Sequence, residues 1–167
     1  SQLRDYTWTN NLVAVISDGS SVLGLGNIGP EAAMPVMEGK AMLFKHYAGV
    51  DAVPIVLDVH TPDEIVSAIK AMHKSFGAIN LEDIAAPACF EVEERLKNEI
   101  DIPVMHDDQH GTAIVVLAGL INAMKVVDKD LQACRIVLIG AGAAGTAIAK
   151  LLTLYIHPEI IAVDSQG

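Results

Sequence analysis

The sequence predicts an α/β protein: a domain built on a mostly parallel sheet, followed by the start of a second α/β domain. Short β-rich runs alternate with longer runs whose apolar residues recur at helical spacing. This alternation is typical of parallel sheets covered by helices. Hydrophobic residues make up 51% of the 167 residues but aromatic residues only 4%, as expected for aliphatic strands buried beneath close-packed helices.

Short aliphatic and β-branched runs that end at polar residues or glycine are predicted to be strands. The first two are expected to pair as a hairpin, because Asp18 and Gly19 between them are typical of a tight turn. In chain order the predicted strands are residues 12–17, 21–25, 51–57, 78–81, 102–105, 135–139 and 159–163.

The segments between these strands carry helical periodicity. Thr61, Pro62 and Glu64 stand at the N-cap, first and third positions of one helix, a capping-box arrangement. Residues 111–127 are so apolar that this helix is expected to be buried on most sides. The predicted helices are residues 32–49, 62–76, 87–99, 111–127 and 143–154.

The charge balance excludes some classes of partner. Acidic residues outnumber basic ones 21 to 11, for a net charge of −10, which argues against binding nucleic acid or an anionic membrane surface. No segment resembles a signal peptide, and the longest uncharged stretch falls short of the roughly 20 apolar residues that cross a bilayer. Cys89 and Cys134 are therefore expected to be reduced thiols of a cytoplasmic protein.

A glycine-rich loop follows the strand at residues 135–139 and opens an Ala-rich helix. It matches the G-x-G-x-x-G pattern, and the next strand ends at Asp164. In such loops the backbone and the helix N-terminus face a pyrophosphate, and the acidic residue binds the ribose hydroxyls. We predict the start of a Rossmann dinucleotide-binding domain, with NAD preferred because Asp164 would repel the 2′-phosphate of NADP. The predicted loop residues are Gly140, Ala141, Gly142, Ala143, Ala144 and Gly145.

A second match to the same pattern, residues 24–29 (GLGNIG), is interpreted differently. Pro30 and Glu31 follow it at once, and no strand with a terminal acid lies at the expected distance. We predict a loop packed near a site rather than a cofactor loop.

Carboxylates follow two predicted strands and indicate a metal site. Glu82 and Asp83 end one strand, and Asp107 and Asp108 end the next. Oxygen-only ligands suit a hard ion such as Mg²⁺ or Mn²⁺, although loop acids and helix caps also occur without a metal. The spacing of His106 and His110 resembles a zinc motif only superficially, because Asp replaces Glu and the segment ends a strand.

Lys40 lies within an apolar helical pattern. Such a lysine often only extends its stem along apolar surface. Beside a metal and out of water it could instead act as a general base.

Taken together, four motifs resemble those of the short bacterial and archaeal malic enzymes, in order and in spacing. The resemblance runs from about Asn11 to the last residue. The motifs are residues 22–30 (VLGLGNIGP), 35–40 (PVMEGK), 80–84 (NLEDI) and 106–113 (HDDQHGTA).

The resemblance implies NAD(P)-dependent oxidative decarboxylation of L-malate to pyruvate and CO₂ by a homodimer that needs Mg²⁺ or Mn²⁺. It implies that Lys40 is the general base and that Asp107 partners it. It also implies that Glu82, Asp83 and Asp108 are the metal ligands. The family's proton-donating tyrosine belongs to an upstream motif, and Tyr6 does not match it.

The expected domains are residues 1–128, carrying the metal and lysine site, and residues 129–167, the first βαβ unit of a truncated Rossmann domain. Two other enzymes stay open as interpretations: a soluble oxaloacetate decarboxylase of the same family, and a metal-independent protein resembling amino-acid dehydrogenases. A third alternative is a fragment that binds nucleotide and metal without turnover, and we expect the 167-residue chain alone to be inactive.

Overall fold

The computed structural model describes residues 2–59 and 61–164. It divides into two compact units, Ser1–His106 and Asp107–Gly167, and each is described by itself. The domain boundary that the sequence predicts, between residues 128 and 129, is not tested by this division and stays a prediction.

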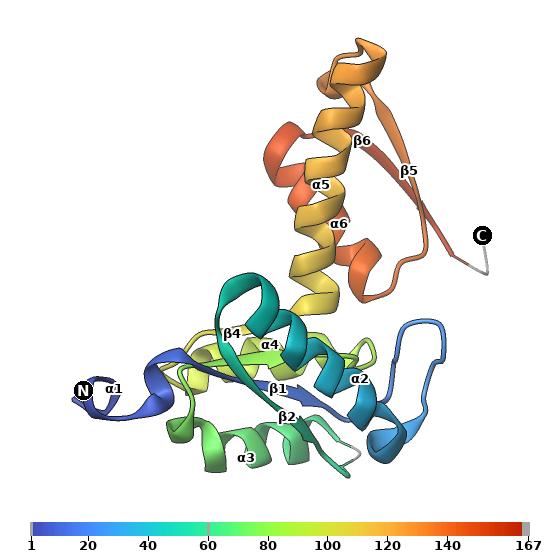
Figure 1. The fold of residues 1–167 in the computed structure, drawn as a ribbon. Helices are drawn as coiled ribbons and strands as arrows, with labels where there is room; N and C mark the ends of the chain where they lie inside the picture. The colour runs from blue at the N-terminus through green and yellow to red at the C-terminus, as the bar shows by residue number, and fades with distance from the viewer. Residues whose placement is uncertain (1, 60, 165–167) are drawn as a thin grey trace. The chain divides into compact units, whose positions relative to one another are not determined.

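The first unit contains a four-stranded sheet in the order β2-β1-β3-β4 (Figure 1). Every neighbouring pair is parallel, which confirms the predicted fold class. The central strand β1 is buried on both faces, with Ala14, Val15 and Ile16 fully inaccessible. The strands are β1 (Leu12–Ser17), β2 (Asp51–Val56), β3 (Ala78–Leu81) and β4 (Val104–His106).

Helices cover both faces of this sheet. Right-handed crossovers place the helix between β1 and β2 on one face and the next two helices on the other, and Figure 1 shows α2 and α3 on opposite sides. Met37 of α2 is fully buried, as are Ile69 of α3 and Leu96 of α4. The helices are α1 (Leu3–Tyr6), α2 (Gly29–Leu43), α3 (Pro62–Met72) and α4 (Ala88–Glu99). Shorter helical turns span Trp8–Asn11, Phe44–Ala48 and His73–Ser75.

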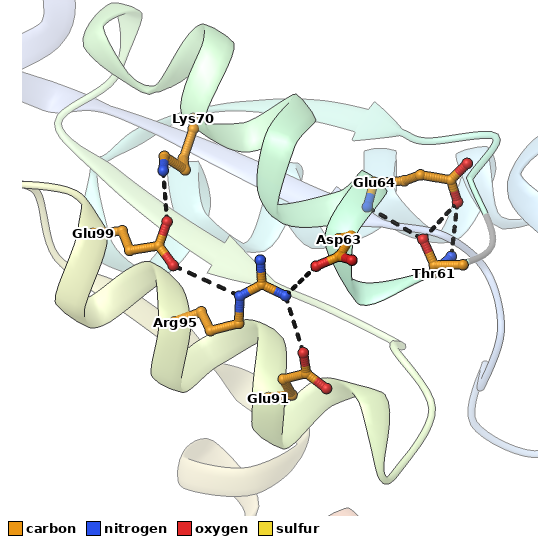
Figure 2. Close-up of polar contacts among 7 residues, drawn as sticks. All are labelled: Thr61, Asp63, Glu64, Lys70, Glu91, Arg95 and Glu99. Atoms are coloured by element: carbon orange, nitrogen blue, oxygen red, sulfur yellow. Dashed lines mark hydrogen bonds and ion pairs between the residues drawn. The ribbon is translucent and has the colours of Figure 1, made fainter.

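The outer surface of α3 and α4 carries a network of caps and ion pairs (Figure 2). The predicted capping box is confirmed: the Thr61 hydroxyl accepts from the Glu64 backbone N–H, and the Glu64 carboxylate accepts from the Thr61 backbone. Arg95 of α4 reaches Asp63 of α3 at 2.6 Å, and Lys70 reaches Glu99 at 2.6 Å. The two ion pairs join α3 to α4 on the face of the sheet opposite α2.

The strand predicted at residues 21–25 is wrong. This segment is a tight turn closed by one antiparallel bridge between Val22 and Gly26. Gly24 and Gly26 adopt positive φ angles of 78° and 74°, which an extended strand does not contain. Leu23 is 94% exposed, so its apolar character does not reflect a buried strand.

The second unit contains the predicted βαβ arrangement. Its strands pair in parallel from Arg135 with Glu159 to Ile139 with Val163. Both strands have the predicted bounds, and α6 extends two residues further than expected. The elements are α5 (Asp107–Val127), a helical turn at Leu131–Ala133, β5 (Arg135–Ile139), α6 (Ala143–Ile156) and β6 (Glu159–Val163).

Helix α5 is not buried on most sides in this structure, contrary to prediction. Gln109 and Ala113 are its only buried residues, and Ile114 and Val115 are 58% and 65% exposed. By length and composition α5 could cross a membrane. In its own unit its main packing partner is α6, which covers one side of an apolar helix.

Candidate functional site

The carboxyl ends of the parallel strands meet at one edge of the first sheet. Ile16 pairs with Leu81, and Leu81 pairs with His106. Glu82 is therefore the first residue after β3. Its backbone N–H continues the pairing with β1 by donating to the Ile16 carbonyl at 2.9 Å. Ligand-binding groups of open parallel sheets gather at this edge.

The loops after β1 and β3 are joined by hydrogen bonds. The Ser21 backbone N–H donates to the Asp83 carbonyl at 3.0 Å, and the Ala85 N–H donates to the Ser20 hydroxyl at 2.8 Å. Asp83 is 4% exposed and has a φ of 55°. Left-handed backbone at a residue other than glycine is rare and concentrates at functional sites, which fits a carboxylate held in a set direction.

Lys40 and Glu82 lie side by side. The Lys40 Nζ atom lies 3.2 Å from Glu82 Oε2, and their side chains are 22% and 10% exposed. The same carboxylate oxygen accepts a hydrogen bond from Asn80 Nδ2 at 2.9 Å. Lys40 comes from α2, and Asn80 and Glu82 come from β3 and the residue after it. The predicted lysine and one predicted metal ligand are thus brought together.

A glutamate of α4 binds the backbone at the end of β4. Glu93 is 6% exposed, and its Oε1 atom accepts from the His106 backbone N–H at 3.0 Å and from Lys97 Nζ at 2.9 Å. Asp107 and Asp108 follow His106 directly and open α5 in the second unit. A buried carboxylate thereby fixes the strand end from which these two acids continue.

Gly111 leaves room for one of these acids. A Cβ atom at this position would strike the Asp107 carboxylate, so glycine here lets the Asp107 side chain lie against the first turn of α5.

The glycine-rich loop of the second unit connects β5 to α6. Gly140 has a φ of 110° and its N–H donates to the Val163 carbonyl at 2.8 Å. A Cβ atom at Gly145 would strike the Gly140 carbonyl, so only glycine lets α6 approach the strand end this closely. Asp164 is exposed immediately after β6, at the same end of the sheet as the loop.

The donor chemistry fits the expected ligands. Glu82, Asp83 and Asp108 offer only carboxylate oxygens, as Mg²⁺ and Mn²⁺ prefer. The loop at residues 140–145 has glycines where a phosphate must approach the backbone, followed by the N-terminus of a 14-residue helix, which suits a pyrophosphate.

Two residues at this edge were missed by sequence reasoning. Asn80 lies within one of the four motifs but has no role assigned from the sequence, and Glu93 is one of several glutamates on its predicted helix. Neither a buried asparagine in a strand nor one glutamate among several on a helix carries a pattern that marks it in advance.

Comparisons with known proteins point to one family. A family model described as malic enzyme, N-terminal domain, matches residues 1–64 and 60–97, and one described as malic enzyme, NAD binding domain, matches residues 109–165. The chain is 59% identical over 167 residues to a bifunctional malic/malolactic enzyme of Bacillus subtilis, covering 100% of this chain and 41% of that protein. It is 62% identical over 161 residues to an NAD-dependent malic enzyme of Geobacillus stearothermophilus, covering 96% and 34%.

Another relative and two solved structures agree. An NADP-dependent malic enzyme of Halomonas elongata is 54% identical over 147 residues, covering 88% of this chain and 35% of that protein. A malic enzyme from Pyrococcus horikoshii superposes with a TM-score of 0.92 at 54% identity, over 98% of this chain and 38% of that one. An NAD-dependent malic enzyme from Thermotoga maritima gives 0.94 at 51% identity, over 99% and 44%. The chain thus spans less than half the length of each of these relatives.

Proposed function

The chain belongs to the malic enzyme family, and from this we propose that the protein containing it oxidatively decarboxylates L-malate. L-malate and NAD⁺ give pyruvate, CO₂ and NADH in a reaction that requires Mg²⁺ or Mn²⁺. NAD is the proposed cofactor, with NADP as the alternative because the relatives include enzymes named for each.

The observation that carries this proposal is the contact between Lys40 and Glu82. An amine 3.2 Å from a carboxylate, at the edge of the sheet where ligands bind, supports the proposal of a base beside a metal ligand. Lys40 would take the proton from the malate hydroxyl, which general-base catalysis requires to lie within hydrogen-bonding reach. Asp107 would partner the lysine.

The remaining predicted residues bind and orient the ligands. Glu82, Asp83 and Asp108 would hold the divalent ion, and the loop at residues 140–145 would hold the pyrophosphate with Asp164 on the ribose. When bound, the ion supplies Lewis acidity at the substrate oxygens and the dinucleotide supplies a hydride acceptor.

We also propose a cytoplasmic homodimer. Among the residues that the structure describes, neither Cys89 nor Cys134 forms a disulfide, as expected in a reducing compartment. Exposed Tyr6, Trp8 and Tyr47 offer aromatic surface on the first unit, which suits a protein interface. We propose that α5 packs within the protein rather than in a membrane, because it packs against α6 in its own unit and nearly all of it lies within the match to the NAD-binding family model. Light scattering of the purified protein should give twice the chain mass.

The test is NAD reduction by the protein containing this chain, with L-malate and Mn²⁺. NADH and pyruvate should form in equal amounts, and EDTA should abolish both. Consumption of oxaloacetate without any NAD reduction by malate would replace the proposal with a decarboxylase. Activity insensitive to EDTA would favour a metal-independent dehydrogenase.

A further inference from the structure

We propose that Asn80 is a positioning residue that fixes the orientation of the Glu82 carboxylate for metal binding. The inference rests on the proposed function, since it takes Glu82 as a metal ligand. It concerns a residue that touches neither the substrate nor the cofactor in that proposal.

The contact that carries the inference joins two buried side chains. Asn80 is 1% exposed and Glu82 8% exposed, and the amide nitrogen lies 2.9 Å from Glu82 Oε2. Because a carboxylate oxygen only accepts, the amide group facing it must be the N–H₂ end. A hydrogen bond to an ionised, buried carboxylate is stronger than one between neutral groups.

The backbone makes this contact directional. Asn80 belongs to β3, whose pairing with β1 and β4 fixes it in register opposite Val15 and Met105. Glu82 lies two residues further along, where the strand ends. The Asn80 amide is therefore fixed within the sheet, and it donates to the Glu82 carboxylate at the end of the strand. This hydrogen bond restricts rotation of the carboxylate.

Glu82 Oε2 also receives Lys40 at 3.2 Å. The amide and the ammonium group thus meet at one oxygen. Without the amide, the carboxylate could follow the flexible lysine, because a lysine side chain has many rotamers whereas the asparagine is packed. Asn80 accordingly keeps Glu82 available to an ion while Lys40 remains beside it.

The other end of the amide is consistent with this role. Asn80 Oδ1 is buried and has no hydrogen-bond partner among the described residues. Asn80 also lines an open pocket of about 130 Å³ with apolar neighbours such as Val13 and Phe44. A buried carbonyl without a partner disfavours folding. The amide is therefore poorly explained by packing alone, whereas its N–H₂ end has a charged partner.

The experiment compares Asn80→Leu, which removes the donor, with Asn80→Gln, which keeps an amide, in the complete protein. Ile79→Val serves as the control, because Ile79 is 2% exposed on the same strand and does not contact Glu82 through a polar atom. Mn²⁺ binding is titrated by the electron paramagnetic resonance signal of the free ion, NAD binding by fluorescence, and folding by the melting temperature.

Asn80→Leu should weaken Mn²⁺ binding roughly 10- to 100-fold, the usual effect of removing a partner of a metal ligand. NAD affinity should not change, and Asn80→Gln should recover Mn²⁺ affinity to within about threefold of wild type. Ile79→Val should bind Mn²⁺ as wild type does even if it melts earlier.

The proposal is overturned if folded Asn80→Leu binds Mn²⁺ as tightly as wild type, or if Ile79→Val weakens Mn²⁺ binding as much as Asn80→Leu does. If Asn80→Leu does not fold, the smaller change Asn80→Ala decides: Mn²⁺ binding weakened roughly tenfold or more supports the role, and binding as tight as that of wild type refutes it. Failure of the wild-type protein to bind Mn²⁺ or to reduce NAD with malate would instead refute the proposed function.

Discussion

Replacing Lys40 with alanine should lower kcat while leaving the metal site intact. Lys40 Nζ lies 3.2 Å from Glu82 Oε2. Loss of a general base costs roughly 10²- to 10⁴-fold in rate, which corresponds to about 2.7 to 5.4 kcal/mol of transition-state stabilisation.

Lys40→Ala should lower kcat but should not lower the affinity for Mn²⁺. Two unit charges 3.2 Å apart attract by about 1 kcal/mol in water and about 5 kcal/mol at an effective dielectric constant near 20. The ammonium group competes with a cation for the Glu82 oxygen, so removing it should not weaken Mn²⁺ binding. Even the lower value corresponds to an affinity gain of about fivefold.

The assay measures kcat with saturating malate and NAD, together with the Mn²⁺ dissociation constant. Lys45→Ala is the matched control, because Lys45 also pairs with one carboxylate, Asp51, at 2.7 Å, but is 62% exposed. That variant should keep kcat within about twofold, since exposed ion pairs contribute little. A fall in kcat of less than tenfold for Lys40→Ala, or Mn²⁺ binding weakened along with it, would refute the role assigned to Lys40.

Three further predictions concern the metal ligand, the nucleotide loop and the surface network. Asp108→Ala should weaken Mn²⁺ binding by more than it weakens NAD binding, as measured by titration of each ligand. Asp164→Ser should shift the ratio of kcat/KM for NAD and NADP toward NADP, and an unchanged ratio would place the ribose contact elsewhere. The hydrogen bond and charge of Lys70 hold the pKa of the Glu99 carboxyl below its ordinary value. This pairing stabilises the fold at neutral pH and is lost as the pH falls below about 4.5. Lys70→Met should therefore lower the melting temperature at neutral pH and have little effect once the pH is low enough to protonate Glu99 in the folded protein.

Much of the fold could be predicted because buried parallel strands have continuous aliphatic sequences. Strands β1 and β3 have the predicted bounds, as do β5 and β6. The segment at residues 21–25 has the same apolar character, but its glycines allow a left-handed turn whose leucines face outward. Composition alone does not distinguish the two. Likewise, the apolar sequence of α5 indicates a helix suited to burial. It does not indicate which other segment packs against that helix.

The candidate site was predicted in its chemistry but not in its contacts. Carboxylates after strands and a lysine in an apolar helix are visible in the sequence. The 3.2 Å contact between Lys40 and Glu82 depends on how α2 crosses the sheet, which no local pattern specifies. Asn80 and Glu93 act through partners in the folded chain, so their surroundings rather than their residue types give them importance.

The central claim is that the acids at the strand ends form a divalent metal site beside Lys40. A crystal structure of the protein with Mn²⁺, using anomalous scattering to locate the ion, tests it most directly. The account predicts one ion within about 2.5 Å of carboxylate oxygens of Glu82, Asp83 and Asp108. An ion bound elsewhere, or no ion at saturating Mn²⁺, would contradict it.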